Sequence, residues 1–450
     1  MPKKKTALTI EERLQQALVP AEEQPYEVPE NWVWVRLGAV CYASKEKSND
    51  FSNEIKYIGL EHLEKDKGIV GFSSADKVKS TKNAFQEGQI LYGRLRPYLN
   101  KHDIASFSGV CSTDILVFEA SVLVANVLVD KFFNLPFFIE YVVANSKGIN
   151  LPRVSEKTIL NTTFPLPPLS EQQRIVERIE ELFAKLDEAK ERLQEVADSF
   201  AVRKAAILHK AFTGELTKQW RRENGVSDES WEEKTLQEVC VMKITDGTHK
   251  TPVYCDSDKG VKFLSAKDIT AEKICWDNIK YIVPELHEEL YKRLAPQVDD
   301  VLLAKNGTTG VAAIVETDDV FDIYVTLAVL RPEKSIIYPH YLLKVVNSPL
   351  CKEQFAQHLT GIGVPNLHLR DIKEVLIPLP TLPEQHEIVR LIDDLLARER
   401  SAQQATEQAL ASIELMKKSI LARAFRGELG TNKASEASAL ELLKQVLAEG

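Results

Sequence analysis

The chain has 450 residues and a formal net charge of −9, with 44% hydrophobic and 27% charged residues. This length exceeds what one hydrophobic core normally organises, and no apolar run approaches the roughly 18 residues that a membrane helix needs. Several water-soluble domains are therefore expected. An acidic protein of this kind does not adhere to nucleic acid through its overall charge.

The first 28 residues predict a short helix followed by a linker. The helix is expected over 11–18, and the segment PAEEQPYEVPE that follows is rich in proline and glutamate. The basic cluster at the start is not followed by the apolar segment of a secretory signal, so we expect a cytoplasmic protein. The six cysteines are scattered without metal-ligand spacing, which indicates reduced, mostly buried thiols.

Residues 29–163 predict a mixed α/β globule. Short strand-type runs such as ILYGRL alternate with turns rich in Gly, Asn and Asp, and helical stretches such as KFFNLPFFIEYVVANS interrupt them. Between Lys77 and Lys101 the chain carries six Lys and Arg residues against Glu87 alone. A basic surface is therefore predicted on this acidic protein.

Residues 164–217 predict a long helix with a coiled-coil seam. Its apolar residues advance in alternating steps of four and three, which is the heptad pattern. They are Ile175, Ile179, Leu182, Leu186, Ala189, Leu193, Val196 and Phe200. Pro168 and Ser170 mark the start of the helix, and Gly214 fits the left-handed stop that glycine allows.

Both elements occur a second time. FPLPPLSEQQRIVERIEELF and IPLPTLPEQHEIVRLIDDLL place Glu171 and Glu384 213 positions apart (384 − 171), and AFTGEL and AFRGEL keep that spacing. Trp32 and Trp231 are only 199 positions apart (231 − 32), so the second copy holds extra residues between these points. The repeat indicates one structural unit built twice, with globules that diverge.

The predicted fold class is α+β: two mixed α/β globules separated by two long antiparallel helices that form an intramolecular coiled coil, with pseudo-two-fold symmetry. The second seam holds Glu399 and Thr406, so its middle is expected to be weaker. A heptad seam also suits oligomerisation, but two matched seams in one chain should pair first because their effective concentration is higher. The predicted divisions are 1–28 (helix and linker), 29–163 (first globule), 164–217 (first long helix), 218–376 (linker and second globule), 377–430 (second long helix) and 431–450 (tail).

This order of globule, long helix, globule, long helix resembles the specificity subunits of type I restriction-modification systems. The markers are PLPPLSEQ at Pro165, PLPTLPEQ at Pro378, the paired AF-x-GEL helix ends, and GQILYGRLRPYLNKHDIASFSGVCSTDILVFEA, which resembles one type of target recognition domain. The resemblance covers the chain from about Trp32 to Leu429. It implies that each globule reads one part of a split double-stranded DNA sequence, and that the helices are a spacer and a docking surface for two methyltransferase subunits. Restriction subunits would complete the complex, and two different globules imply an asymmetric target.

No catalytic constellation is visible in the sequence. It lacks an ATP-binding P-loop and a Rossmann glycine motif, and NLPF at Asn134 departs from the N-P-P-[FY] tetrad of amino-methyltransferases. We therefore expect a chain that is not an enzyme by itself and holds no cofactor or metal, with S-adenosylmethionine, ATP and magnesium bound by partner subunits. The alternative is a non-catalytic scaffold whose two globules bind protein partners.

The candidate DNA contacts lie in both globules. In a strand, Arg94 and Arg96 would project from one face, where arginine can bond guanine or clamp a phosphate; both roles stay open. The first globule supplies Lys77, Lys79, Lys82, Tyr92, Arg94, Arg96, Asn100 and Lys101, with the lysines as phosphate contacts. The second supplies Thr248, His249, Lys250, Lys305, Asn306, Thr308 and Thr309 from the glycine-containing turns TDGTHK and AKNGTTG, although ordinary hairpin turns share this composition. Gly148, Pro152, Gly361 and Pro365 are interpreted as structural turns.

Overall fold

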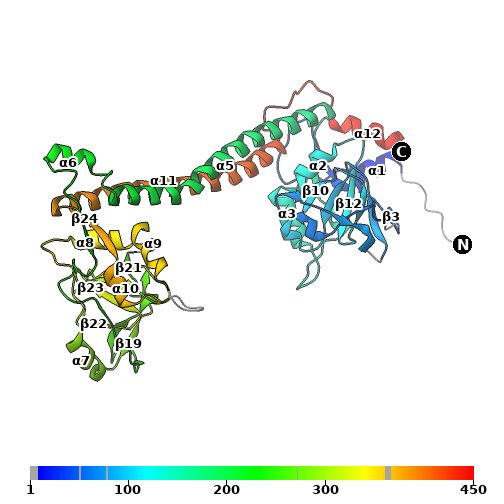
Figure 1. Cartoon of the computed structure of the whole chain (residues 1–450). Helices are drawn as coiled ribbons and strands as arrows, with labels where there is room; N and C mark the ends of the chain where they lie inside the picture. Colours follow the sequence, from blue (N-terminus) through cyan, green and yellow to red (C-terminus); the bar gives the residue numbers. More distant parts are fainter. Residues whose placement is uncertain (1–8, 50–51, 78–79, 271, 360–365, 450) are drawn as a thin grey trace. The chain divides into compact units, whose positions relative to one another are not determined.

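The computed structural model describes residues 9–49, 52–77, 80–270, 272–359 and 366–449 (Figure 1). The chain divides into two compact units, residues 1–193 with 408–450, and residues 194–407. Each unit contains one globule and a part of both long helices. The unit boundaries thus cut across helices that the sequence divisions treat as whole elements, and those divisions stay predictions.

The two predicted long helices are α5 (Leu169–Phe212) and α11 (Leu382–Ala424), which lie side by side in each unit (Figure 1). The seam of α5 is buried at Ile179 and Phe200, whereas Val196, which lies between them in the seam, is exposed. Two helices alone cover only part of an apolar stripe. The pair therefore leaves apolar side chains accessible along its length.

Ion pairs between the helices establish their direction. In the first unit Lys190 Nζ lies 2.7 Å from Glu414 Oε1, and in the second Arg203 Nε lies 3.0 Å from Glu399 Oε2. Residue numbers rise along one helix as they fall along the other, so the predicted antiparallel pairing is confirmed. Glu399 thus has a cationic partner at its seam position, while Thr406 is buried and donates its hydroxyl to the backbone of its own helix.

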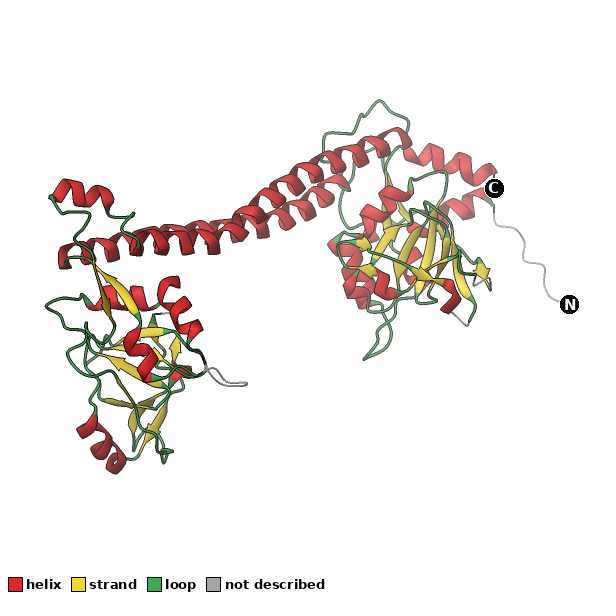
Figure 2. Ribbon diagram, in the orientation of Figure 1, coloured by secondary structure: helices red, strands yellow, loops and turns green. Residues whose placement is uncertain are grey.

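The two globules share a four-stranded sheet of the same order and differ in the size of their second sheet. The strands are yellow in Figure 2. In the described part of the first globule, one sheet has the order β10-β9-β12-β2 and a second has the order β3-β8-β11-β4-β7. In the second globule the corresponding orders are β21-β20-β23-β15 and β19-β16-β22. An antiparallel pair (β9 with β12, β20 with β23) lies at the centre of one sheet, and a parallel pair (β4 with β11, β16 with β22) belongs to the other.

The strands of the first globule are β1 (Val33–Arg36), β2 (Cys41–Ala43), β3 (Lys47–Ser48), β4 (Lys56–Ile58), β5 (Leu63–Glu64), β6 (Gly68–Ile69), β7 (Ser73–Ser74), β8 (Lys82–Phe85), β9 (Ile90–Gly93), β10 (His102–Ile104), β11 (Gly109–Cys111), β12 (Ile115–Ala120) and β13 (Thr163–Leu166). Its helices are α2 (Asn126–Phe133), α3 (Pro136–Ala144) and α4 (Glu156–Leu160). β1 pairs with β13, so the strand that enters the globule is bonded to the strand that leads into α5.

The strands of the second globule are β14 (Glu232–Thr235), β15 (Thr245–Asp246), β16 (Val261–Leu264), β17 (Ile269–Thr270), β18 (Lys273–Ile274), β19 (Lys280–Ile282), β20 (Val301–Ala304), β21 (Ala312–Ile314), β22 (Phe321–Ile323), β23 (Leu327–Leu330) and β24 (Leu376–Leu379). Its helices are α7 (Pro284–Arg293), α8 (Pro339–Val346), α9 (Pro349–Gln357) and α10 (Leu369–Glu374), after α6 (Lys218–Asn224). β14 pairs with β24, which repeats the pairing of β1 with β13.

The Glu-Gln pair of the repeated motif fastens each long helix to its globule. Gln172 Nε2 donates to the carbonyls of Leu123 (2.8 Å) and Pro167 (3.2 Å), and Gln172 Oε1 accepts from the amide of Ala125 (3.2 Å). These bonds tie the first turn of α5 to the segment between β12 and α2. The side chain replaces the water that those backbone groups would otherwise need.

Gln385 repeats this arrangement in the second unit. Its Nε2 donates to the carbonyls of Ile336 (2.9 Å) and Pro380 (2.8 Å), and its Oε1 accepts from the amide of Tyr338 (2.7 Å). Gln172 and Gln385, at equivalent positions of the two repeats, therefore make equivalent hydrogen bonds to the backbone of their globules.

The preceding glutamates are buried and accept different donors. Glu171 accepts from Trp32 Nε1 (2.7 Å), Thr431 Oγ1 (3.0 Å) and Asn432 Nδ2 (2.8 Å), so the end of one repeat closes on the start of the other. Glu384 accepts from Thr217 Oγ1 (2.6 Å) and Arg221 Nη1 (2.7 Å).

Two features complete the frame of the repeats. Gly214 (φ 79°) and Gly427 (φ 73°) adopt the predicted left-handed conformation after the long helices. In the first unit, α1 (Ile10–Ala17) packs against the C-terminal helix α12 (Ala439–Glu449), and Leu443 of α12 is buried. The predicted N-terminal helix is therefore confirmed, and the tail of the chain is part of the same core.

The six cysteines are free thiols that differ in burial. Three are buried and three are half-buried. Burial raises the pKa of the Cys351 thiol to about 12, so it stays protonated at neutral pH. Every helix in the described part of the chain is too short or too polar to cross a lipid bilayer.

Replacing Glu384 with alanine tests the fastening of α11. The change leaves the buried Arg221 guanidinium without its inner carboxylate, and we expect a loss of about 3 kcal/mol in the free energy of unfolding, measured by urea denaturation. The control is Asp394→Ala on the same helix, which removes an exposed pair with Arg398 and should cause no measurable change. Equal effects of the two variants would contradict the assignment.

Candidate nucleic-acid interface

The basic loop of the first globule, defined here as residues 94–101, begins where β9 ends at Gly93. The amide of Arg94 donates to the carbonyl of Asp114 (2.9 Å), and the carbonyl of Arg94 accepts from the amide of Val154 (3.0 Å). Arg96 then takes a left-handed conformation with φ 53°. The prediction that Arg94 and Arg96 share one strand face is therefore wrong, because the strand has ended and the backbone turns between them.

Tyr92 lies in the core below this loop. Its ring stacks on the ring of His102, with centroids 6.1 Å apart and planes 13° apart, and its side chain is fully buried. Burial raises the pKa of the Tyr92 hydroxyl well above its usual value. The prediction of Tyr92 as a DNA contact is wrong, since a side chain at the centre of the sheet cannot reach a duplex.

The far end of the basic loop is held by a buried polar chain. Asn100 Nδ2 donates to the carbonyl of Phe133 (3.0 Å) and lies 3.1 Å from His102 Nε2, while His102 Nδ1 lies 2.6 Å from Asp130 Oδ1. Asn100 is itself left-handed, with φ 41°. Because its amide is buried among these partners, Asn100 holds the loop on α2 instead of contacting DNA, which corrects the prediction for this residue.

The remaining cations of the first globule differ in accessibility. Arg96 is exposed and Arg94 is half-buried. Lys101 Nζ donates to the carbonyl of Leu60 (2.9 Å), and Lys82 Nζ donates to Ser80 Oγ (2.8 Å). These four stay predicted contacts, with Arg96 the most accessible. Lys79 and the side chain of Lys77 lie outside the described residues.

The turn TDGTHK of the second globule surrounds a buried ion pair. Lys305 Nζ lies 2.9 Å from Asp246 Oδ2, and both side chains are buried. Thr248 is buried too, bridged to the backbone of Tyr324. Lys305 is therefore a neutralised core cation, and the predictions of Lys305 and Thr248 as DNA contacts are wrong for this geometry. Gly247 permits the close packing, since a Cβ there would lie 2.0 Å from the carbonyl oxygen of Ile323.

The other predicted residues of the second globule lie nearer the surface. His249 is exposed with Nε2 3.2 Å from Asp246 Oδ1, and the exposed Lys250 pairs with Glu289 at 2.8 Å. Thr308 Oγ1 donates to a backbone carbonyl (3.2 Å), and Thr309 Oγ1 donates to the carbonyl of Gly307 (3.4 Å). Asn306 Nδ2 donates to Asn366 Oδ1 (2.8 Å). These five stay predicted DNA contacts.

Two basic residues near these loops were not among the residues predicted from the sequence, Arg153 and Lys373. Arg153 Nε lies 3.1 Å from Asp114 Oδ1, next to the basic loop. The pKa of Lys373 is lowered, first by desolvation and then by the positive charge of Lys243. The sequence around Lys373 did not indicate these neighbours, because Lys243 and Asp246 are distant from it along the chain.

The loops after β9 and β20 have the same backbone support. Val154 donates its amide to the carbonyl of Arg94 (3.0 Å), and Leu367 donates its amide to the carbonyl of Lys305 (2.8 Å). In each globule the residue directly after the central strand is thus held by the segment that leads towards the long helix. The scaffold recurs while the side chains on it differ.

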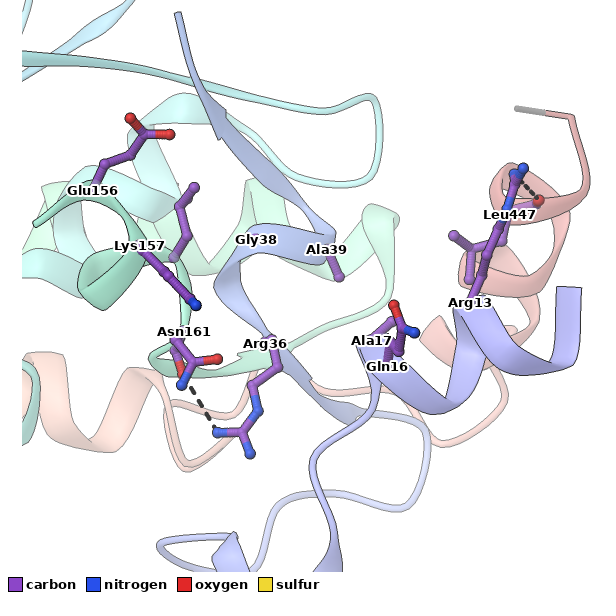
Figure 3. Close-up of a pocket in the computed structure, with 11 residues that line it drawn as sticks. Arg13, Gln16, Ala17, Arg36, Gly38, Ala39, Glu156, Lys157, Asn161 and Leu447 are labelled. Atoms are coloured by element: carbon purple, nitrogen blue, oxygen red, sulfur yellow. Dashed lines mark hydrogen bonds between the residues drawn. The ribbon is translucent and has the colours of Figure 1, made fainter. Parts of the chain in front are cut away.

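One cavity of the first unit lies apart from these loops. A cavity of about 520 Å³ is lined by α1, α4, α12 and the chain after β1 (Figure 3). Arg36 Nη1 donates to the carbonyl of Asn161 (3.4 Å), and Arg13 Nη1 donates to the carbonyl of Leu447 (3.5 Å). None of the predicted DNA contacts lines it. Across the described residues, no group of three His, Cys, Asp or Glu side chains is placed to hold a metal ion.

Comparison with known proteins decides the family. Residues 29–198 and 228–410 match the family described as type I restriction modification DNA specificity domain. The chain belongs to this family. The two matched ranges correspond to the two copies of the internal repeat, so both halves of this specificity protein carry the family's unit.

Individual specificity subunits show how far the likeness extends. The chain is 29% identical to the type I restriction enzyme EcoBI specificity subunit of Escherichia coli over 340 residues, 70% of each chain. It is 25% identical to the MjaVIII specificity subunit of Methanocaldococcus jannaschii over 413 residues, 86% of this chain and 92% of the relative. The HsdS subunit from Thermoanaerobacter tengcongensis has a similar fold, with a TM-score of 0.65 at 22% identity over 90% of this chain and 99% of that one. A chain from a study of type I restriction-modification complex assembly gives 0.69 at 23% identity, covering 90% of this chain and 100% of that one.

Replacing Asn100 with alanine tests the support of the basic loop. The variant leaves the carbonyl of Phe133 without its donor, and we expect a loss of about 1–3 kcal/mol in the free energy of unfolding by urea denaturation. Asn145→Ala is the matched control, since this exposed asparagine donates to the carbonyl of Tyr141 on the surface of α3. A stability loss as small as that of the control would rule out a supporting role for Asn100.

Proposed function

We propose that this chain is the DNA specificity subunit of a type I restriction-modification complex and reads a split, asymmetric duplex target. The observation that carries the proposal is a four-stranded sheet of one order, built twice with different loops on it. A recognition protein with two such readers addresses two half-sites, and different loops address different base sequences. The family and its named specificity subunits support the same conclusion.

The chemistry of the two loops differs in a way that favours an asymmetric target. The first loop offers the exposed Arg96 and the half-buried Arg94, whose guanidinium groups suit bidentate contacts with guanine or phosphate. The second offers the hydroxyls of Thr308 and Thr309 on a turn behind a neutralised lysine. Such different donors do not read one base pattern.

The helix pair supports docking of two methyltransferase subunits. Val202 on α5 and Leu415 on α11 are 213 positions apart (415 − 202), so they are equivalent in the repeat. They are 70% and 66% exposed. Apolar side chains held in water at equivalent places indicate two equivalent contact surfaces for a partner.

The reactions of the complex are assigned to the partners in this proposal. The methyltransferase subunits would bind S-adenosylmethionine, and restriction subunits would use ATP and magnesium. The chain itself would supply recognition and assembly without chemistry of its own.

A footprint of the assembled complex tests the division of labour between the globules. Arg96→Ala should weaken protection of one half-site roughly tenfold, and Lys250→Ala should weaken the other, because each removes a cation from one reader. Lys334→Ala, which removes an exposed cation paired with Asp299, is the control. If the complex binds no DNA, and if its binding of protein partners does not change with salt concentration, the chain would instead be a protein-binding scaffold.

Charged substitutions on the helices test the docking surfaces. Leu415→Asp and Val202→Asp should each remove one methyltransferase subunit from the complex, as counted by native mass spectrometry, because a carboxylate cannot enter an apolar contact. Ile336→Asp, at an exposed apolar position of the second globule, is the control. Retention of two subunits by both helix variants would contradict this docking site.

A further inference from the structure

A tight hairpin, residues 147–153, projects next to the basic loop of the first globule. Lys147 and Arg153 exchange both backbone hydrogen bonds, at 2.9 Å and 2.8 Å. Gly148 has φ 106°, a conformation that an L side chain adopts only with strain, and a Cβ there would lie 3.0 Å from the carbonyl oxygen of Leu151. The turn is therefore a defined structure with a fixed tip.

The tip of this hairpin is apolar and open to water. Ile149 is 100% exposed and Leu151 is 44% exposed, and the described residues 147–151 are all exposed. Turns normally carry polar residues, and these two side chains contribute nothing to the core. They can contribute apolar burial only when a binding partner covers them.

The surroundings of the tip are cationic. The amide of Arg96 donates to the carbonyl of Pro152 (2.7 Å), and Leu95 is bridged to Arg153, so the hairpin and the basic loop form one backbone assembly. Lys147 at the base of the hairpin is exposed, and the carboxylate of Asp114 is engaged by Arg153. An apolar tip set among cations complements a nucleic-acid groove lined with phosphates.

The apolar pair also recurs in the sequence of the second repeat. GINLP at 148–152 corresponds to GIGVP at 361–365, and both hold isoleucine followed two positions later by an aliphatic residue. Residues 361–365 lie outside the described part of the chain. The residues that follow the central strands differ between the repeats, whereas an isoleucine and a second aliphatic residue occur in both segments. A sequence feature common to both repeats does not account for a difference in base preference between them.

We infer that the 147–153 hairpin is a DNA-contacting element whose apolar tip, Ile149 with Leu151, enters a groove of the duplex beside the basic loop. The inference rests on the proposed function and adds a contact for it. In this arrangement the cations choose and hold the site, and the tip supplies apolar contact with base edges or base steps whatever their sequence. The hairpin therefore sets affinity and docking rather than the identity of the target.

The experiment uses the full chain assembled with its methyltransferase subunits. The target is first read from modified bases in cells that carry the system, and a duplex of that sequence is the probe. Ile149→Ser should weaken binding of this duplex at least tenfold. The set of modified sequences in cells should stay unchanged. Val122→Ser is the matched control, because Val122 is 79% exposed in the same globule but lies after β12.

A photo-cross-linking amino acid at position 149 gives a second measurement that does not depend on stability. It should attach to the probe duplex, whereas the same residue at position 122 should not. Equal binding by Ile149→Ser and Val122→Ser together with no cross-link to DNA overturns the inference. Loss of methyltransferase subunits from the Ile149→Ser complex also overturns it and marks the tip as a protein contact. If the unaltered complex protects no split site, the proposed function fails, and the inference fails with it.

Discussion

The buried Glu-Gln pairs at the starts of the two long helices are the contacts on which the rest of this structure depends. Gln172 and Gln385 bond the first turn of each helix to backbone groups of a globule, and Glu171 and Glu384 gather the end of the opposite repeat onto the same turn. A buried carboxylate needs hydrogen-bond donors. Glu171 accepts at both oxygens, whereas Glu384 accepts from Thr217 and Arg221 at Oε1 and its Oε2 has no partner among the described residues. Each glutamate therefore depends on the neighbouring elements being in place. A globule therefore has a defined attachment to its helix pair.

Recognition loops are built on the part of the globule that is free to vary. The central strands β9 and β20 end in residues held by the same backbone bonds, so the position of each loop is inherited from the scaffold. The side chains from that point on differ between the repeats: Arg94 is half-buried and Arg96 is exposed, whereas Lys305 is buried in an ion pair with Asp246. Separating scaffold from loop allows a new target without a new fold.

Much of the architecture follows from the sequence because it is local and repeated. The heptad spacing from Ile175 to Phe200 predicts the first long helix directly, and the glycines at 214 and 427 predict where the two long helices end. The loop residues depend on distant partners instead. Arg96 turns left-handed although a residue before proline usually stays extended, because its amide is bonded to Pro152 far along the chain. The burial of Lys305 likewise depends on Asp246, and that of Asn100 on Phe133, so composition alone assigned these residues to the surface.

The division of the first unit between both ends of the chain has a consequence for its synthesis. The ring of Phe425 packs against Phe132 and Phe164, with centroids 5.7 Å and 6.3 Å away, and Leu443 of α12 completes the same core. A ribosome delivers Phe132 and Phe164 long before Phe425, while the second unit, 194–407, emerges as one continuous stretch. The earlier-made globule thus lacks this aromatic ring in its core until Phe425 has been translated. A chain that stops between residues 407 and 425 would contain the whole second unit and a first unit without Phe425 and Leu443.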